Sequence, residues 1–168
     1  MNDSQIKKLK AGDEIKLSGV IYTARDQAHK RLAAAIKSGK RLPIDLKGAI
    51  IYYCGPTGKP GGKVIGSCGP TTSGRMDKFT PALLKTGLKG MIGKGARSKE
   101  VIDAIKRHKA VYFLAHAGCG ALINKCVKKA KAVAFKDLGP EAIHKLEVKD
   151  FYLIVGVDSH GRDIYAKK

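Results

Sequence analysis

The sequence predicts an α/β fold, a single compact domain built around a mixed sheet. Strand-like and helix-like segments alternate along the 168 residues, and turn signals are evenly spaced between them. No low-complexity linker divides the chain, so we expect one domain over residues 13–168 and a mobile arm over residues 1–12. Hydrophobic residues make up 43% of the chain and charged residues 28%, which is typical of a packed core and not of a disordered chain.

Periodicity and end signals locate the individual elements. Strands are predicted where apolar and polar residues alternate or where a short apolar run lies between turn residues, and helices where apolar residues recur every three or four positions. Asp26, Thr80 and Ser98 are expected to cap three of the helices. Gly39 and Gly87 are expected to end two of them. In order along the chain, the predicted elements are a strand over 15–22, a helix over 26–39, a strand over 48–54, a helix over 80–87, a short strand over 89–92, a helix after Ser98, a strand over 110–115, a helix over 118–131, a strand over 132–135, a helical turn after 139–140, and strands over 151–157 and 162–166.

Two elements in the second half of the chain are predicted from specific patterns. In residues 118–131, apolar residues recur at helical spacing, so a helix is predicted there. The two final strands flank the turn sequence Asp158-Ser159-His160-Gly161, which predicts a β-hairpin.

The charge of the chain indicates an anionic partner without identifying it. There are 33 Lys and Arg residues against 14 Asp and Glu, a formal net charge of +19. A basic surface of this kind suits nucleic acid, an acidic protein partner or a dianionic metabolite. The basic residues are spread from Lys7 to Lys168, and no zinc-finger, RNP-type or basic-zipper pattern occurs. A solvated basic surface without a specific role is the plain alternative.

The apolar segments are too short to cross a bilayer. The longest, Ala110–Gly118, is interrupted by His116 and falls far short of the roughly 20 residues of a spanning helix. The first twenty residues contain charges throughout and no apolar signal-peptide core. We therefore expect a cytoplasmic protein with no membrane partner.

The cysteines do not form a framework. Cys54, Cys68, Cys119 and Cys126 contain no Cys-x-x-Cys pair, and such a scatter fits reduced thiols better than disulfides. We expect them to be small buried hydrophobic residues. An oxidation-sensitive Cys68, three residues before Thr71, is the alternative.

One short sequence occurs twice. Cys54-Gly55-Pro56-Thr57 recurs as Cys68-Gly69-Pro70-Thr71, with the Gly-rich stretch 58–62 between the copies. The second copy continues through two more hydroxyl residues to Arg75 and Asp77. Hydroxyls, backbone N–H groups and an arginine in a tight loop can bind a carboxylate or a phosphate. An ordinary turn, with the hydroxyls bonded to their own backbone, fits the same residues.

Two further segments could also bind an anion. Lys94 lies between Gly93 and Gly95, which let the backbone approach a ligand and leave the ammonium with little steric cover. The pattern is neither a Walker P-loop nor a dinucleotide-binding fingerprint. Arg25 lies at the junction of a predicted strand and a predicted helix. The N-terminus of that helix and the Arg25 guanidinium together form a candidate anion site. A surface ion pair with an acidic neighbour explains Arg25 equally well.

Taken together and in this order, three segments resemble the class I iron–sulfur fumarate hydratases. They are Thr23–Arg31, Gly69–Asp77 and Ile92–Gly95, and the string Gly-Pro-Thr-Thr-Ser-Gly-Arg-Met-Asp is the most specific of them. The resemblance is to the C-terminal domain of these enzymes and covers nearly the whole chain. That domain is a separate β subunit in two-subunit members, as it is in L-tartrate dehydratase.

The resemblance implies a hydro-lyase. The enzyme we favour is fumarate hydratase, which reversibly adds water to fumarate to give L-malate. Its 4Fe-4S cluster would be held by three cysteines of a partner α subunit, in a heterodimer or an α2β2 assembly, so we expect no metal on this chain. The implied fold is a swivelling β/β/α domain similar to the mobile domain of aconitase. The β subunit of L-tartrate dehydratase is the alternative, because both substrates are dicarboxylates.

The resemblance also assigns roles to matching residues. Thr71 is the candidate base for the carbon-bound proton, and because a free threonine hydroxyl is far too weak a base, it needs the positive charges of Arg75 and Lys94 nearby. Thr71 and Lys94 are therefore the catalytic candidates. Arg25 and Arg75 would bind the substrate carboxylates bidentately, and Thr72 would add a hydroxyl donor.

Other roles are less direct. Asp26 and His29 belong to the matching motif and are expected to position the substrate-binding residues from behind, while the general acid should come from the partner subunit.

A basic nucleic-acid-binding protein, the alternative from another class, would use Tyr22, Tyr52 and Tyr53 as a stacking surface. These tyrosines lie in apolar strands and only 6% of the residues are aromatic, so we expect them to pack in the core.

Overall fold

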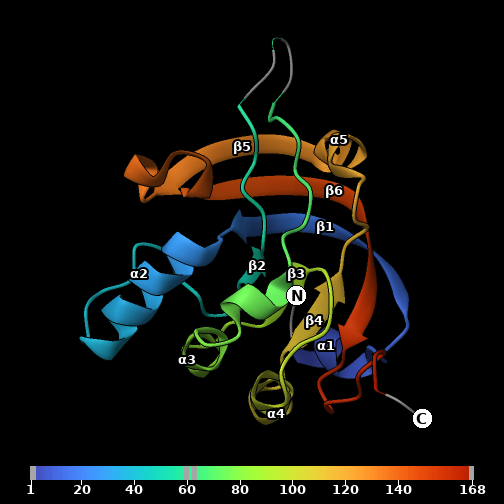
Figure 1. Ribbon diagram of the computed structural model, residues 1–168. Coiled ribbons are helices and arrows are strands. Elements are labelled where there is room, and N and C mark those ends of the chain that lie inside the picture. Colours follow the sequence, from blue (N-terminus) through green and yellow to red (C-terminus); the bar gives the residue numbers. More distant parts are fainter. Residues whose placement is uncertain (1–2, 59–60, 62–63, 167–168) are drawn as a thin grey trace.

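The computed structural model describes residues 3–58, 61 and 64–166 (Figure 1). The strands are β1 Glu14–Thr23, β2 Ile50–Tyr52, β3 Gly90–Gly93, β4 Val111–Leu114, β5 Val127–Ala134 and β6 Ile143–Val157. The α-helices are α1 Asp3–Lys8, α2 Asp26–Lys37, α3 Thr80–Lys85, α4 Lys99–His108 and α5 Gly120–Ile123. The 3₁₀ turns are η1 Ser73–Met76, η2 Asn124–Cys126 and η3 Lys136–Glu141.

The strands form a mixed sheet that closes on itself. The strand order is β1-β2-β3-β4-β6-β5, and β1 also pairs with β6. Strands β1 to β4 run parallel to one another, whereas β6 runs antiparallel to β1, β4 and β5. In Figure 1, β1, β5 and β6 lie together at the top, and α2, α3 and α4 lie below and to the left. The predicted α/β class and mixed sheet are confirmed.

Alternating side chains of β2, β3 and β4 enter two separate cores. Ile51 and Met91 pack with helix residues such as Leu32 in one core, whereas their neighbours Tyr52 and Ile92 pack with residues of β1 and β6 in the other. All five are at most 1% exposed, and full burial stabilises an apolar side chain of this size by about 1.5–3 kcal/mol. Successive residues of a strand face opposite sides of the sheet. One face of β2, β3 and β4 therefore packs against β1 and β6, and the other packs against the helices. The order of layers is β1 with β6, then β2 to β4, then the helices.

Several predicted elements are confirmed with changed bounds. Strands lie where 15–22, 89–92 and 110–115 predict them, and the strand predicted over 48–54 is shortened to β2. Helix α4 follows Ser98, whose hydroxyl accepts a hydrogen bond from the Val101 N–H at 3.4 Å. Gly39 and Gly87 follow the ends of α2 and α3 with φ of 65° and 100°, a left-handed conformation that favours glycine.

Two predicted caps are wrong because their side chains bond elsewhere. Arg25 occupies the N-cap of α2, and Asp26 is the first residue of the helix. Phe79 occupies the N-cap of α3, and the hydroxyl of Thr80 donates to the Met76 carbonyl at 2.9 Å. In both helices the polar residue lies one position later than the capping pattern indicates.

Two predictions for the C-terminal part of the chain differ from the structure. The helix expected over 118–131 is wrong, since α5 covers four residues and β5 begins within the segment. Pairing with β6 along its length holds β5 extended, so a tertiary contact overrides the local helical spacing. The predicted hairpin is present in reduced form. Its first strand is the end of β6, which begins at Ile143. Within the described residues, its second strand is reduced to an antiparallel bridge between Val157 and Asp163 with backbone hydrogen bonds on either side.

The N-terminal segment contacts the domain. The side chain of Ile6 in α1 is 1% exposed within the sheet–sheet core, and the Ala11 N–H donates to Asp158 at 3.1 Å. Mobility of residues 1–12 stays a prediction. Residues 1–2, 167–168 and most of the Gly-rich stretch 58–62 lie outside the described residues.

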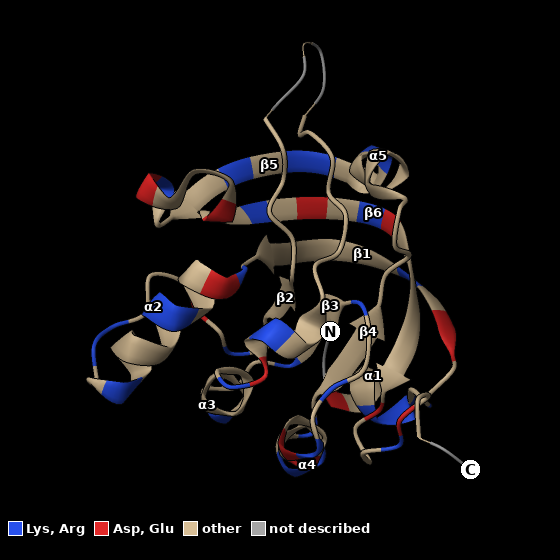
Figure 2. Ribbon diagram, viewed as in Figure 1, with Lys and Arg blue, Asp and Glu red and all other residues tan. Residues whose placement is uncertain are grey.

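The basic residues lie on several elements. Figure 2 shows Lys and Arg on α2, on β5 and β6 and on the connecting loops. The edge strand β5 exposes Lys128, Lys129 and Lys131, and charges on an edge strand oppose pairing with other chains. Lys129 forms an ion pair with Glu147 of β6 at 3.2 Å. Among the described residues, no helix has the length and apolar character needed to cross a membrane.

Candidate functional site

The three sequence motifs meet where the parallel strands end. The first motif begins at the last residue of β1, the second contains η1, and the third runs from the end of β3 into the following loop. The Thr71 N–H donates to the Tyr53 carbonyl, just beyond β2, at 2.7 Å. Thr72 and Lys94 then form a parallel β-bridge. The second motif is therefore bonded both to the residue after β2 and to the residue after β3. Ligand sites of α/β sheets commonly lie at this carboxyl edge.

A carboxylate lies between the two arginines of the site. Arg75 Nε donates to Asp26 Oδ1 at 2.9 Å, and Arg25 Nε lies 3.8 Å from Asp26 Oδ2. The Arg75 side chain is 52% exposed, whereas those of Arg25 and Asp26 are 26% and 23% exposed. Asp26 therefore contacts both cations. Its positioning role and the roles of the arginines in substrate binding stay predictions.

The structure places Arg25 against the first copy of the repeated sequence. A Cβ atom on Gly55 would lie 2.9 Å from Arg25 Cδ, so only glycine lets the arginine lie here. Arg25 Nη2 lies 3.8 Å from one oxygen of Glu141, and the other oxygen accepts the Gln27 N–H at 3.0 Å. The N-terminus of α2 is thus partly occupied by a carboxylate of the same chain. Sequence reasoning missed Glu141, because 114 residues separate it from Gln27.

Two buried atoms of this cluster have no hydrogen-bond partner. They are Arg25 Nε and Asp26 Oδ2, and their separation of 3.8 Å is too long for a hydrogen bond. Buried polar atoms in native proteins are nearly always bonded to protein, water or ligand. The guanidinium of Arg25 thus has donor capacity left for another group.

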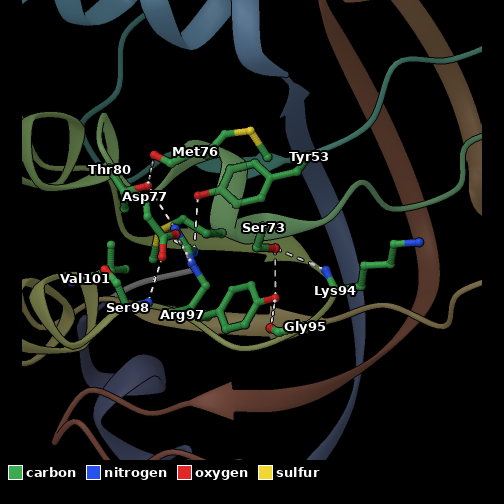
Figure 3. A network of polar contacts seen from close by, with 12 residues as sticks. Tyr53, Ser73, Met76, Asp77, Thr80, Lys94, Gly95, Arg97, Ser98 and Val101 are labelled. Carbon is green, nitrogen blue, oxygen red and sulfur yellow. Dashed lines mark hydrogen bonds and ion pairs between the residues drawn. The ribbon is translucent and has the colours of Figure 1, made fainter.

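The remaining predicted site residues leave their polar ends free. Thr71 and Lys94 are half-buried and Thr72 is exposed. Within the described chain, the hydroxyls of Thr71 and Thr72 and the ammonium of Lys94 have no protein partner. Figure 3 shows the Lys94 side chain directed away from the neighbouring polar contacts. We call the predicted residues of this surface the rim: Arg25, Asp26, Thr71, Thr72, Arg75 and Lys94.

His29 lies behind the rim. Its ring is fully buried, and Nδ1 donates to the Arg25 carbonyl at 2.9 Å. Burial lowers the pKa of His29 to about 4, an effect that the hydrogen bond to Arg25 and the charge of Asp26 oppose and the charge of Arg97 reinforces. The ring is therefore neutral near pH 7, with its proton on Nδ1. A neutral His29 thus bonds the backbone of Arg25, and its positioning role stays a prediction.

The two glycines beside Lys94 also shape the contact between two loops. A Cβ atom on Gly93 would lie 2.0 Å from Ser73 Oγ, and Gly95 has a φ of 81°. Gly93 therefore allows the second motif to pack against β3, and Gly95 turns the chain after Lys94. Both glycines therefore serve the contact between two loops, and their role in the approach of a ligand stays a prediction.

Beneath the rim lies a set of buried polar residues that sequence reasoning missed. Arg97 is the only arginine among the buried polar residues of the described chain, and it bonds Asp77 and Thr80 (Figure 3). Asp77 is the last residue of the most specific motif, which is a signal for its importance. Arg97 lies outside all three motifs, and nothing in its sequence neighbourhood marks it.

The cysteines are free thiols, and Cys54 and Cys68 are buried as expected. The neighbouring Cys54 thiol lowers the pKa of Cys68, and burial opposes the shift. Cys119 and Cys126 are half-buried. Among the described residues, no group of three or more His, Cys, Asp or Glu side chains could hold a metal ion.

The tyrosines of the nucleic-acid alternative are mostly inside. Tyr52 and Tyr53 are 1% and 0% exposed, and Tyr22 is half-buried. Their expected packing in the core is confirmed for the first two. Buried rings are not available for stacking on bases.

Comparison with known proteins gives one family. The family model described as Fumarase C-terminus matches residues 1–168. A relative from Methanocaldococcus jannaschii, provisionally named L(+)-tartrate dehydratase subunit beta, is 43% identical over 171 residues, which cover 98% of this chain and 88% of the relative. Fumarate hydratase 2 of Leishmania major and the anaerobic class I fumarate hydratase of Escherichia coli K12 are each 38% identical. Those alignments cover 97% and 96% of this chain but only 29% and 30% of the two relatives.

Proposed function

Because the chain belongs to the fumarase C-terminus family, we propose that it is the β subunit of a hydro-lyase acting on a dicarboxylate. The reaction we favour is the reversible hydration of fumarate to L-malate. The observation that carries the proposal is the rim, where Arg25 and Arg75 lie on either side of Asp26 and a buried nitrogen of Arg25 lacks a partner. Such a pair of guanidinium groups suits a ligand with two carboxylates.

A partner subunit completes the enzyme in this proposal. The chain spans only 29% and 30% of two fumarate hydratase relatives, so the remaining part would be a separate α subunit, in a heterodimer or an α2β2 assembly. That subunit would carry the 4Fe-4S cluster. The described residues of this chain do not fit a cluster, because they contain no group of three suitable ligands and because Cys54 and Cys68 lie in the apolar core. The steps below concern this chain alone.

Binding would begin with exchange of carboxylates at the rim. The contacts of Arg25 with Asp26 and Glu141 are both 3.8 Å long, so a substrate carboxylate can replace them at little cost. Arg75 donates only its Nε to Asp26, which leaves its terminal nitrogens for the second carboxylate. Thr72, exposed beside Lys94, would donate its hydroxyl to the ligand. A dianion held at both ends is oriented for reaction.

Proton transfer would involve the free hydroxyl of Thr71. In the dehydration direction, Thr71 would first lose its hydroxyl proton to solvent, and the resulting alkoxide would take the proton from C3 of malate and become a hydroxyl again. The C–H electron pair forms the double bond, and the hydroxyl at C2 leaves as water with a proton from the partner subunit. The positive charges of Lys94 and Arg75 would lower the cost of the threonine alkoxide. Rotation of this domain on the partner would bring the rim over the substrate.

A second substrate has specific support. The relative named L(+)-tartrate dehydratase subunit beta is 43% identical and is covered over 88% of its length. Tartrate and malate both carry two carboxylates, and the rim residues named here serve those groups in either case. Dehydration of L-tartrate is therefore the alternative function. We place the enzyme in the cytoplasm.

Reconstitution with the cluster-bearing subunit tests this function. The chain purified alone should contain no iron and should not change the absorbance of malate, fumarate or tartrate solutions. Co-expressed with an α subunit that carries three cluster cysteines, it should turn over one of the three. Turnover by the isolated chain would contradict the two-subunit proposal, and an assembled complex with bound cluster but no turnover of any dicarboxylate would contradict the proposed reaction.

A further inference from the structure

One cation is buried directly beneath the rim. The side chain of Arg97 is 0% exposed. Its Nε donates to Asp77 Oδ1 at 2.8 Å, and Nη2 donates to Thr80 Oγ1 at 2.9 Å. Its Cζ lies 5.3 Å from the ring centroid of Tyr53 and 4.9 Å from that of Tyr112. The guanidinium is thus held by an ion pair with Asp77 and by two aromatic rings. Figure 3 shows the polar contacts.

Asp77 connects this cation to two loops. Its second oxygen accepts the Ser98 N–H at 2.7 Å. Asp77 lies at the C-terminal end of the second motif, and Ser98 caps α4 just after the third. Both oxygens of Asp77 therefore bond adjacent residues, Arg97 and Ser98. A carboxylate held in this way ties the end of the second motif to the segment that follows the third.

A chain of hydrogen bonds with fixed directions lies next to the cation. The Tyr112 hydroxyl donates to the Gly95 carbonyl at 2.8 Å, so in the 2.8 Å contact between Ser73 Oγ and the Tyr112 oxygen the serine is the donor. Ser73 Oγ is then free to accept the Lys94 N–H at 3.1 Å. The Ser73 N–H donates to the Lys94 carbonyl at 3.0 Å. We call Tyr53, Ser73, Asp77, Thr80, Arg97 and Tyr112 the buried network.

The buried network joins residues that the proposed function needs together. Ser73 follows Thr71 and Thr72. Two of its hydrogen bonds reach the N–H and the carbonyl of Lys94, and the third reaches Tyr112. Arg97 fixes Tyr112 through its ring, and Tyr112 fixes Ser73 and Gly95. Each nitrogen of the guanidinium has an acceptor within 3.5 Å, whereas Arg25 Nε has none.

We propose that Arg97 is a positioning residue that holds the loop of Thr71 and Thr72 at a fixed distance from Lys94. Asp77 and Tyr112 carry this effect to the two loops. The consequence for catalysis rests on the proposed function, whereas the coupling of the loops does not. A residue that only stabilised the fold would loosen all parts of the molecule alike.

Amide hydrogen exchange of the full chain tests the coupling. Arg97→Lys keeps the charge but loses the planar fork, and Tyr112→Phe keeps the ring but removes the hydroxyl. Both should speed exchange at the Ser73 and Lys94 amides by at least about tenfold, with the Leu146 amide in β6 changed far less. Ile105→Val, which leaves a small cavity under α4 away from the loops, is the control. Should Arg97→Lys fail to fold, Tyr112→Phe alone decides. Unchanged exchange at Ser73 and Lys94, or the same increase at Leu146, would overturn the proposal.

Kinetics of the assembled two-subunit enzyme test the consequence. Tyr112→Phe should lower kcat by about tenfold or more while KM changes by less than about threefold, because Arg25 lies on another element and keeps its place. Loosened loops with an unchanged kcat would overturn the positioning role. A wild-type enzyme without turnover would contradict the proposed function, and the exchange result would still decide whether Arg97 couples the loops.

Discussion

The rim and the buried network lie next to each other and use the same kinds of residue, yet their polar atoms are satisfied to different degrees. In the rim, Arg25 Nε and Asp26 Oδ2 are buried without partners. In the buried network, Arg97 donates from every nitrogen, and both oxygens of Asp77 accept. The exposed fractions differ as well, 52% for the Arg75 side chain and 0% for that of Arg97.

This difference separates binding from support. Atoms that lack a partner in the free chain can bond a ligand without first breaking strong contacts, whereas satisfied atoms hold geometry. Charge alone would not distinguish Arg25 from Arg97. The hydrogen-bond partners of each arginine do.

The largest stability effect should separate the two arginine–aspartate pairs. Arg97→Met leaves the carboxylate of Asp77 mostly buried and without its cation, which should lower the free energy of unfolding by about 3–5 kcal/mol. Arg75→Met breaks a half-exposed pair with Asp26 and should cost less than about 1 kcal/mol. Urea unfolding of the two variants measures both values. Equal losses would erase the distinction between the rim and the buried network.

A pH effect should appear at His29, which touches both regions through the Arg25 carbonyl and the Tyr53 ring. Burial lowers the pKa of His29 to about 4 in the folded chain, against about 6.5 in an unfolded one. Below pH 6.5 the unfolded state therefore binds a proton that the folded state excludes, and stability falls as the pH decreases toward 4. The total loss should be roughly 3 kcal/mol.

His29→Asn supplies the comparison, because its amide can still donate to the Arg25 carbonyl but does not titrate. Unfolding followed by chemical denaturation at pH 7, 6, 5 and 4 should show a shallower decline for this variant. The same slope in both proteins would mean that another group causes the acid sensitivity.

The rim should determine kinetics where the buried network determines stability. In the assembled enzyme, Arg75→Lys keeps the charge but cannot bind a carboxylate bidentately. We expect a loss of about 100-fold in kcat/KM, or about 2.7 kcal/mol. Steady-state assays with malate and fumarate measure it, with urea unfolding as the check that stability is retained. Unchanged kinetics would make Arg75 a structural residue.

The smallest expected effect compares two glycines in the same loops. A Cβ at Gly93 would lie 2.0 Å from Ser73 Oγ, while a Cβ at Gly74 would meet nothing within 4 Å. Gly93→Ala should therefore cost about 1–3 kcal/mol. Gly74→Ala should be neutral or slightly stabilising, since it restricts the unfolded chain. Thermal unfolding distinguishes the two, and equal melting temperatures would show that the loops do not depend on this close approach.

The residues of the rim could be named from the sequence because three segments resemble one family. The structure brings these segments together where the parallel strands β1, β2 and β3 end. Glu141 and Arg97 escaped prediction for the opposite reason. Each acts across a long sequence separation on a residue that the motif already names, and a single charged residue has no periodicity to detect.

The errors in the fold have a related cause. In 118–131 the local spacing fits a helix, but pairing of β5 with β6 decides the conformation, and such pairing is not encoded in spacing. The caps assigned to Asp26 and Thr80 failed because those side chains bond Arg75 and Arg97 instead. Where a polar residue is needed by a site or a network, a local capping rule gives the wrong partner.

The central claim is that a free hydroxyl of the rim removes the proton, and exchange of the malate C3 proton with solvent deuterium tests it most directly. The measurement uses the assembled enzyme with Thr71→Val or Thr72→Val, each of which keeps the β-branched shape and removes one hydroxyl. The account predicts exchange slowed by about 10² to 10⁴-fold in Thr71→Val and a much milder change in Thr72→Val. Exchange at a near-normal rate in Thr71→Val would contradict it, because the proton would then be taken by another group.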